Sequence, residues 1–495
     1  MVHLMNELAP DACVPGNHEF DFSRERFNQL VESCNFPWVL SNAEEQTKDG
    51  WATLKYLHRY TVLEAGPDEQ KLRIGIIGLI SADTVSKTNS QARGTFRLCE
   101  PNSNENEEMK KKCMKLAAEL RGEPEKCDLV FALTHGVFDE DIDLGKHANC
   151  YTVGDFSSLG KGVLKDTPGI DLILGGHDHE YFLGKGVKLI ETTFPQGKRE
   201  PPKTQGALDN DDGLLLIKSG TDFQDLSEIE ITVEEGNEQV RRKVIKSVEV
   251  KRHCYPDTTR KVLAKDSQKD RMGDLLRRIF KYQVGSEMKK PVAQLPPEIL
   301  PSALANGSQE SRQGETILGN WIADSMIRWY KNHRTENMKP LSDLIFVMGG
   351  GSIRTGLDVD PKRVTQGDIV SLNPFITSLV TFKITGKALW EAFEQALRES
   401  VKTSPSTHKA FGGFPVVSGI KVEWDSTEPK GKRVRTLTLS SGVAVEQDTE
   451  HFYNILTDSY LANGGDDLTA LKEHTEYVDS EIPVYRALLT DIGEF

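Results

Sequence analysis

Short apolar runs that each end in a histidine are the feature that most constrains how this 495-residue chain can fold. Cys127–Leu133 is mostly apolar and is followed by Thr134-His135-Gly136, and Ile170–Leu174 is followed by Gly175-Gly176-His177-Asp178-His179. A third run, Leu72–Leu79, is apolar enough to be buried on both faces. Strands of this kind, alternating with helical segments, indicate an α/β layered domain. Because ligand-binding loops converge at the carboxyl ends of such strands, the histidines are expected to lie near one another.

A second group of reactive side chains lies near the start of the chain, in Gly16-Asn17-His18-Glu19-Phe20-Asp21-Phe22. Val14-Pro15 leads into it, and Pro followed by Gly predicts a sharp turn. Asn17 offers a carbonyl oxygen, and His18 offers a nitrogen that can bind a metal or transfer a proton near neutral pH. Asp21 can hydrogen-bond to that imidazole and orient it.

Any one of these histidines alone is more often an ordinary loop residue than a metal ligand. The coincidence of His135, His177 and His179 with the Asn-His pair at 17–18 favours a shared metal site. His177 and His179 can face one site from a non-helical turn, and Gly175-Gly176 lets the backbone approach closely. Nitrogen and oxygen ligands without thiolate suit Zn²⁺, Mn²⁺ or iron.

The second half of the chain also alternates strands and helices. Apolar stripes predict helices over residues 315–331 and 386–401, and apolar runs predict strands over 343–348 and 453–457. A glycine-rich turn, Gly349-Gly350-Gly351-Ser352-Ile353-Arg354, follows the first of these strands. This pattern predicts a second, smaller α/β domain.

The character of the sequence changes between the two halves. Residues 270–283 are charged and helical in pattern, and prolines then recur up to position 301. We therefore predict a domain over residues 1–254, a linking helix and connector over 255–301, and a second domain over 302–495.

Composition limits the partners and surroundings that suit this chain. It is 37% hydrophobic and 27% charged, as in ordinary globular proteins, and no apolar run approaches the roughly 18 residues of a membrane-spanning helix. The net charge of −14 argues against nonspecific nucleic-acid binding and against anionic membranes. Seven scattered cysteines without a CxxC pair favour a reducing compartment such as the cytoplasm. The oligomeric state is left open.

The residues at 16–21 resemble the signature of the calcineurin-like metallophosphoesterases, specifically the 5′-nucleotidase branch. The resemblance implies a two-sheet sandwich flanked by helices and two divalent metal ions, zinc or manganese. It implies that His18 and Asp21 form the catalytic pair. The metal ligands that it implies are Asn17, His135, His177 and His179.

The family pattern also contains an Asp-x-His strand and a Gly-Asp turn ahead of the asparagine, and the 16 residues before Asn17 contain neither. By resemblance, His179 belongs to the metal that Asp-x-His would complete, and Asn17, His135 and His177 belong to the other metal. We therefore expect an N-terminally truncated domain that retains the second metal better than the first. The alternative is a longer protein, whose start would contain any signal peptide.

The second half of the chain resembles the substrate-binding domain of the same family, from about residue 312 to 468. The resemblance implies that Arg312 and Arg354 bind phosphate and ribose, since guanidinium donates in a planar fork. It places Phe375 and Tyr460 on the two faces of the base and Asp466 at the sugar–base end. Because stacking tolerates every base, broad nucleotide specificity is expected.

One position of the glycine-rich turn departs from the family. Gly349 stands where the family has asparagine, so that contact is lost or supplied elsewhere.

The function that these resemblances imply is metal-dependent hydrolysis of nucleotides, most directly of nucleoside 5′-monophosphates to nucleoside and phosphate. Two alternatives remain open. One is hydrolysis of UDP-sugars or 2′,3′-cyclic nucleotides, and the other is a nucleotide-binding protein without catalysis, because the first metal site is incomplete.

Overall fold

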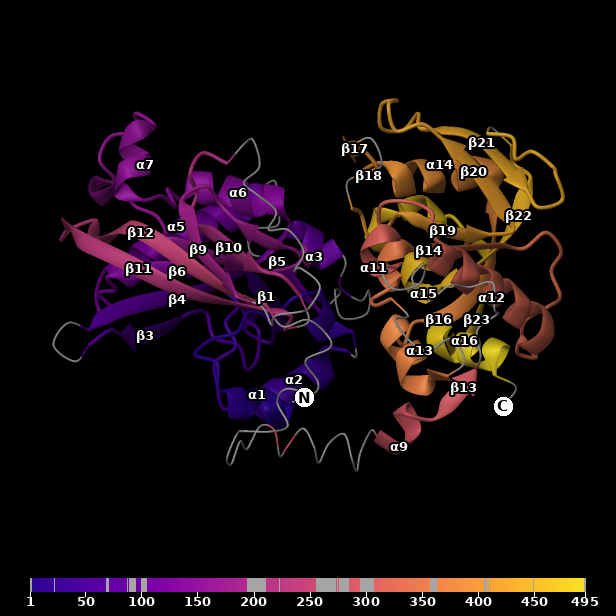
Figure 1. The fold of residues 1–495 in the computed structure, drawn as a ribbon, viewed down its shortest axis with the longest axis horizontal. Helices are drawn as coiled ribbons and strands as arrows, with labels where there is room; N and C mark the ends of the chain where they lie inside the picture. The colour runs from indigo at the N-terminus through magenta and orange to yellow at the C-terminus, as the bar shows by residue number, and fades with distance from the viewer. Residues whose placement is uncertain are drawn as a thin grey trace. The chain divides into compact units, whose positions relative to one another are not determined.

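The computed structural model of the protein describes residues 2–21, 23–67, 71–86, 88, 95–98, 105–193, 211–221, 223–254, 273, 275, 285–293, 307–356, 363–404, 407–408, 410–447 and 449–493. The chain divides into two compact units, Met1–Leu276 and Arg277–Phe495, and each is described by itself (Figure 1). The boundaries predicted at 254 and 302 stay a prediction, because most of the segment between them lies outside the described residues.

The first unit is built around a six-stranded sheet in the order β3-β4-β6-β7-β10-β8. The four inner strands run parallel, whereas the edge strands β3 and β8 are antiparallel to their neighbours. The apolar runs of the sequence therefore form the centre of this sheet, as predicted. Its strands are β3 (Thr61–Ala65), β4 (Leu72–Ile80), β6 (Leu129–His135), β7 (Leu172–Gly175), β8 (Tyr181–Leu183) and β10 (Leu216–Ser219).

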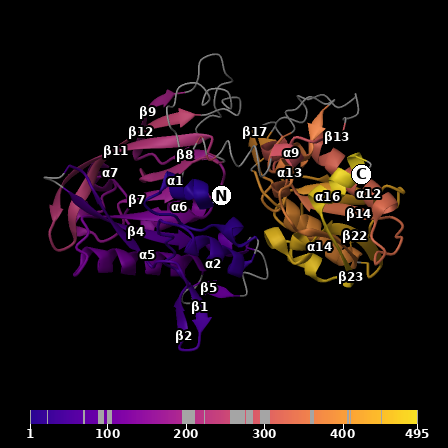
Figure 2. The same ribbon diagram turned by 90° about the horizontal axis from the view of Figure 1, so that it is seen from below.

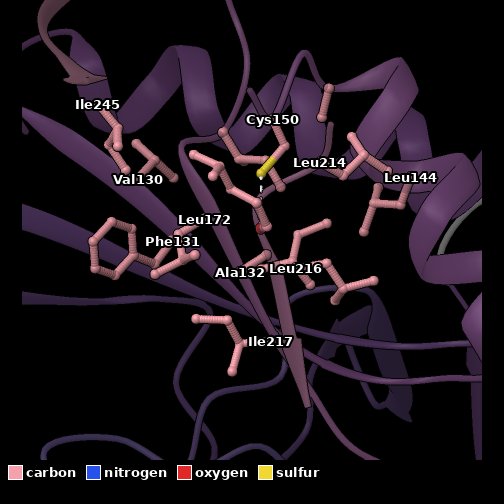
Figure 3. Close-up of a cluster of buried hydrophobic side chains, with 14 of the residues drawn as sticks. Val130, Phe131, Ala132, Leu144, Cys150, Leu172, Leu214, Leu216, Ile217 and Ile245 are labelled. Atoms are coloured by element: carbon pink, nitrogen blue, oxygen red, sulfur yellow. Dashed lines mark hydrogen bonds between the residues drawn. The ribbon is translucent and has the colours of Figure 1, made fainter. Parts of the chain in front are cut away.

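Helices α5 (Glu105–Arg121) and α6 (Phe138–His147) share one hydrophobic core with this sheet and with β12 (Arg241–Cys254). β12 is the middle strand of a second sheet, in the order β11-β12-β9. Figure 3 shows part of the core, where Leu144 of α6 and Ile245 of β12 belong to the same cluster as side chains of the inner strands. These layers are the α/β sandwich that the sequence predicted, and they hold the strand ends in fixed positions.

A smaller cluster supports the N-terminal motif. Phe20, Phe27 of α2 and Phe96 of β5 are buried together there. The small sheet β2-β1-β5 belongs to this part, and its β1–β2 hairpin extends away from the six-stranded sheet (Figure 2). The other elements of the first unit are α1 (Val2–Leu8), η1 (Asn17–Phe20), α2 (Arg24–Glu32), β1 (Ala43–Thr47), β2 (Gly50–Thr53), α3 (Ala82–Ser86), β5 (Phe96–Leu98), α7 (Val153–Ser158), η3 (Leu164–Asp166), β9 (Val187–Thr193) and β11 (Asp225–Asn237).

The apolar segment at 36–42 looks like a further strand in the sequence, but the structure shows only isolated bridges there. Trp38 pairs with Cys13, and Val39 pairs with His58. Because neighbouring residues pair with different segments, no continuous ladder forms.

The second unit is a five-stranded sheet, in the order β19-β14-β22-β16-β23, between two hydrophobic clusters. Along β14, Phe346 and Met348 enter the cluster with α12 and α16, and Ile345 and Val347 enter the cluster with α14. This alternation places the helices on opposite faces of the sheet. The main elements are α12 (Ile317–His333), β14 (Ile345–Gly349), α13 (Gln366–Leu372), β16 (Ser378–Thr385), α14 (Gly386–Leu397), β19 (Pro415–Ser418), β22 (Phe452–Asp458), β23 (Thr475–Pro483) and α16 (Val484–Ile492).

The helices and strands predicted for this half therefore lie close to their expected positions. Shorter elements complete the unit: α9 (Gly285–Met288), β13 (Pro291–Ala293), α11 (Gly307–Glu310), η6 (Gly350–Ser352), β15 (Val364–Thr365), β17 (Lys402–Ser404), β18 (Thr407–His408), β20 (Ile420–Trp424), β21 (Val434–Leu439), α15 (Ser459–Ala462), η7 (Gly465–Asp467) and η8 (Thr469–Lys472).

Part of the predicted connector is structured. β13 pairs with β15 of the second unit, and Gln366 N donates to Lys290 O at 3.0 Å. Residues 290–293 therefore pack as part of the second unit.

Neither membrane spans nor disulfides are found in the described part of the chain. No helix there is both long and apolar enough to cross a membrane. The described cysteines are all free: Cys13, Cys34, Cys113, Cys127, Cys150 and Cys254.

Candidate active site

The N-terminal motif forms a tight helical turn that is anchored from both ends. Glu19 Oε2 accepts a hydrogen bond from Gly16 N at 2.6 Å, which closes the turn η1. Burial raises the pKa of the Glu19 carboxyl. Phe20 is 1% exposed, with its ring 5.0 Å from that of Phe27. These contacts hold Asn17 and His18 in place, whereas Phe22 of the motif lies outside the described residues.

His135 reaches this turn from the carboxyl end of β6. Its Nε2 lies 3.2 Å from Asn17 Oδ1, although 118 positions separate the two residues. Gly16 makes this approach possible, because a Cβ at that position would lie 2.5 Å from His135 Cε1 and Nε2. Glycine is thus required at position 16 by the imidazole packed against it.

His177 joins them from the loop after β7. The rings of His135 and His177 have centroids 4.8 Å apart and are inclined by 67°. His177 and His179 both have left-handed backbone conformations, with φ of 81° and 62°. The structure therefore brings Asn17, His135 and His177 together, which is the set that the resemblance assigns to one metal. His179 lies on the same turn, two residues after His177.

These donors fit one divalent cation of borderline softness, which accepts imidazole nitrogen and amide oxygen. Two imidazoles and one amide oxygen converge, and Gly16 leaves the space in which they meet. Within the residues that the structure describes, no group of three or more His, Cys, Asp or Glu side chains could by itself hold a metal ion. A metal site here would take its third donor from the amide of Asn17.

His18 and Asp21 make the contact that the sequence predicted. His18 Nδ1 lies 3.0 Å from Asp21 Oδ2, and the two side chains are 38% and 27% exposed. Donation of the Nδ1 proton to the carboxylate orients the ring and presents Nε2 for proton transfer. The partial exposure leaves this pair accessible to a substrate.

A buried ionic cluster that the sequence analysis missed lies against the same loops. Lys218, at the end of β10, pairs with Asp141 of α6 at 2.8 Å and with Asp178. Burial raises the pKa of Asp178 to about 6. A sequence feature that could have indicated this cluster is Lys218 itself, because it is a cation directly after the apolar run Leu214–Ile217.

In the second unit, the glycine-rich turn is fixed to the loop that contains Phe375. Asn373 Nδ2 donates to Ser352 O at 3.0 Å, and Arg354 N donates to Leu372 O at 2.9 Å. The Arg354 guanidinium lies 5.6 Å from the centre of the Phe375 ring. Arg354 and Phe375 are therefore neighbours.

Arg312 lies on a segment that packs against the same turn. A Cβ at Gly350 would come within 2.0 Å of Ser311 O, and Phe411 N donates to Arg312 O at 2.9 Å. The absence of a side chain at Gly350 is thus needed for residues 311–312 to approach.

Asp466 and Tyr460 are held together next to Gly349. Tyr460 Oη donates to Asp466 Oδ1 at 3.2 Å and accepts from Asp466 N at 3.0 Å. Burial raises the pKa of Tyr460 well above its ordinary value. A Cβ at Gly349 would lie 3.0 Å from Asp466 Oδ2, so the carboxylate is next to the position where the family has asparagine.

The predicted residues are thus divided between the two units. Asn17, His18, Asp21, His135, His177 and His179 belong to the first unit, and Arg312, Arg354, Phe375, Tyr460 and Asp466 belong to the second. Their roles stay predictions at this point.

Comparison with curated proteins shows relatives along almost the whole chain. An apyrase from Tabanus yao is 26% identical over 491 residues, covering 95% of this chain and 74% of that protein. A 5′-nucleotidase from Vibrio vulnificus (strain CMCP6) is 25% identical over 484 residues, covering 96% of this chain and 75% of that protein.

A solved structure shares the fold. The 5′-nucleotidase precursor from Thermus thermophilus superposes with a TM-score of 0.70 at 21% sequence identity, covering 98% of this chain and 80% of that chain.

Family models match both units. The calcineurin-like phosphoesterase model matches residues 1–181, and the model of the 5′-nucleotidase C-terminal domain matches residues 291–473. The chain thus combines a calcineurin-like phosphoesterase domain with a 5′-nucleotidase C-terminal domain, which makes it a 5′-nucleotidase-like phosphoester hydrolase.

Proposed function

We propose that this protein hydrolyses nucleotides with the help of a divalent metal ion, most directly nucleoside 5′-monophosphates to nucleoside and phosphate. The convergence of Asn17, His135 and His177 beside the His18–Asp21 pair is the observation that carries this proposal. The relatives named 5′-nucleotidase and apyrase support a nucleotide as the substrate.

In this proposal, Asn17, His135 and His177 hold one ion, zinc or manganese, and His179 belongs to a second position. When bound, such an ion polarises a phosphoryl oxygen and lowers the pKa of a bound water toward about 7. His18 steadies the phosphoryl oxygen or protonates the leaving group, and Asp21 keeps its ring oriented.

Residues of the second unit bind the nucleotide. Arg312 and Arg354 donate to phosphate and ribose, because guanidinium matches these oxygens in a planar fork. Phe375 and Tyr460 stack on the base, and Asp466 accepts hydrogen bonds at the sugar–base end. The packing of Arg354 against Phe375 and the bonding of Tyr460 to Asp466 support these assignments.

The test is an assay of the purified chain. The protein is freed of metal with EDTA, and phosphate release from AMP is followed after addition of Mn²⁺ or Zn²⁺. We expect turnover that depends on added metal and that is lost again with EDTA. Metal-independent phosphate release, or none with either ion, would contradict the proposal.

A second candidate is a nucleotide-binding protein without catalysis. The observation that favours it is that the residues brought together, Asn17, His135 and His177, belong to one of the two ions that the family resemblance implies. Elemental analysis and AMP titration separate the two. One metal per chain, tight AMP binding and no phosphate release would favour this candidate.

The substrate could also be another phosphoester of the same class. A relative from Bacillus subtilis (strain 168), the trifunctional nucleotide phosphoesterase YfkN, is 23% identical over 97% of this chain, which covers 29% of that protein. The same assay with UDP-glucose and with 2′,3′-cyclic AMP decides whether these esters are cleaved faster than AMP.

A further inference from the structure

A single buried ammonium group connects the two loops that contain the histidines. Lys218 is 1% exposed, and its Nζ donates to Gly136 O at 2.7 Å and to Gly176 O at 3.0 Å. It also forms ion pairs with Asp141 at 2.8 Å and with Asp178. Oxygens from two separate segments of the chain therefore surround its N–H groups.

The sheet order explains why this lysine reaches both loops. β10 lies beside β7, with Lys218 in register with Gly175, and β7 lies beside β6. The loop after β6 begins with Gly136, directly after His135. The loop after β7 contains Gly176, directly before His177. A long side chain at the end of β10 can thus bridge the two loops next to the candidate ligands.

The contacts of Asp178 stabilise an unfavourable backbone conformation. Its neighbours His177 and His179 have backbone φ angles of 81° and 62°, which residues other than glycine rarely adopt. Such conformations persist where the surroundings fix them. Asp178 Oδ1 accepts from Phe138 N at 3.3 Å, at the start of α6, and its Oδ2 is bound by Lys218. The residue between the two histidines is therefore held on both of its oxygens.

The buried charges are compensated within the cluster. Asp141 and Asp178 are both withdrawn from solvent, and a charge in such a place is stable only when it is paired. Burial acts to lower the pKa of Lys218, but the two carboxylates outweigh it and raise this pKa, so the ammonium keeps its charge. Removal of Lys218 would leave two carboxylates and two carbonyls without their cation.

We propose that Lys218 is a positioning residue of the metal site. It fixes the loops after β6 and β7 relative to each other, so that His135 and His177 meet Asn17 around one divalent cation. This inference rests on the proposed function, because the ligand roles of these three residues are part of that proposal.

The test compares Mn²⁺ binding of wild type and Lys218→Met by isothermal titration calorimetry without substrate, at a temperature where circular dichroism shows both to be folded. Methionine keeps much of the length of the side chain and removes the charge. Loss of a group that orients metal ligands typically weakens metal binding about 10- to 100-fold, so we expect the Mn²⁺ dissociation constant to rise at least about tenfold.

The matched control is Arg121→Met, which removes another cation, with a side chain that is 7% exposed, at the opposite ends of the same strands. Arg121 pairs with Asp171 at 2.5 Å, directly before β7, and Asp171 accepts from Val130 N near the start of β6. We expect Arg121→Met to lower the melting temperature while changing the Mn²⁺ dissociation constant less than about twofold. If both variants weaken Mn²⁺ binding equally, the effect is general destabilisation and the proposal is wrong.

A second variant keeps the proposal testable if Lys218→Met does not fold. Asp178→Asn keeps the Lys218–Asp141 pair and removes one charge of the cluster. We expect it to weaken Mn²⁺ binding at least about threefold, because it removes only part of the contacts that orient the ligands. An unchanged dissociation constant in the folded variants, or no Mn²⁺ binding by wild type, would overturn the positioning role.

The outcome also separates this inference from the proposed function. A wild type that binds Mn²⁺ but releases no phosphate from AMP would contradict hydrolysis and leave the role of Lys218 intact. An active wild type with unchanged Mn²⁺ binding in Lys218→Met would contradict the role of Lys218 alone.

Discussion

At the scale of single residues, the absence of a side chain at Gly16 matters as much as the donors around it. The His135 ring occupies the space that a Cβ would need, at 2.5 Å, and this position lets its Nε2 reach Asn17. A real Cβ contact is essentially never that short, so either the ring or the turn must move if a side chain is added.

We predict that Gly16→Ala weakens Mn²⁺ binding by at least about tenfold, because it separates ligands that the wild type brings together. Isothermal titration with Mn²⁺ measures this. Gly154→Ala is the control, since nothing lies within 4 Å of a Cβ there. Equal Mn²⁺ affinity of Gly16→Ala and wild type would show that His135 is not a ligand at this position.

His18 differs from the ligands because its expected effect is on the chemical step. We predict that His18→Ala lowers kcat for AMP by about 10²–10⁴-fold, as for loss of a general acid or base, and leaves AMP affinity nearly unchanged. Asp21→Asn should lower kcat less, since an amide oxygen can still accept from His18 Nδ1. Steady-state kinetics and equilibrium AMP binding measure the two quantities. A loss of affinity with unchanged kcat would contradict the role of His18.

At the scale of elements, the short helix α15 depends on a carboxyl that is costly to bury. Asp458 is 2% exposed at the end of β22, and its Oδ1 accepts from Leu461 N at 3.0 Å, which caps the helix that contains Tyr460. Burial raises the pKa of Asp458 from its ordinary value of 3.8 to about 6. The ionised form is therefore disfavoured in the folded state. The resulting loss of stability begins as pH rises above the ordinary value of 3.8 and is complete above about 6.

We predict that Asp458→Asn raises the free energy of unfolding at pH 8 by about 1–3 kcal/mol, because asparagine caps a helix as well as aspartate and has no charge to bury. As pH falls through about 6, the wild-type carboxyl is protonated in the folded state, and the advantage of the variant shrinks toward zero near pH ~4. Urea unfolding at about pH 8 and about pH 5 measures this.

The control for this prediction is the exposed Asp425, where hydrogen bonds from Thr427 lower the pKa to about 2. Asp425→Asn should give no gain under the same alkaline conditions. If Asp458→Asn is less stable than wild type at about pH 8, the charge of Asp458 stabilises the folded state and the prediction is wrong.

The elements that the sequence could predict are those whose signal is local. The buried strands before His135 and His177 are continuous apolar runs, and the helix with Trp329 shows a clear apolar stripe. The contact of His18 with Asp21 follows from a spacing of three residues in a turn. The apolar residues at 36–42 also look like a strand, but no ladder forms there, because Trp38 and Val39 pair with different segments, which no local pattern reveals.

Contacts that depend on sheet order could not be predicted from local pattern. Lys218 follows an apolar run, and a cation in that place would usually face solvent. It is buried because β10 lies next to β7, so that Asp141 and Asp178 meet its ammonium from two other elements. Asp466 is a similar case, since Gly349 and Gly412 approach its carboxylate from strands and loops that are distant in sequence.

At the scale of the whole molecule, the chain consists of two units, and among the residues that the structure describes each unit has its own hydrophobic clusters. The candidate metal ligands belong to the first unit and the candidate nucleotide contacts to the second. Metal binding and nucleotide binding are therefore expected to respond to different substitutions.

We predict that Phe375→Ala weakens binding of AMP, GMP, CMP and UMP to a similar degree, by about 1–3 kcal/mol each, because a stacking ring contacts the π-face that every base has. Measured in EDTA, this effect is free of any metal contribution. The Mn²⁺ affinity of Phe375→Ala should equal that of wild type. His135→Ala should instead weaken Mn²⁺ binding and leave nucleotide binding in EDTA unchanged.

The control is Phe452→Ala, which removes a 47% exposed ring at the start of β22. It should leave both affinities unchanged. A loss confined to one base would mean that Phe375 reads the edge of that base or supports a specific pocket, and it would contradict the stacking role.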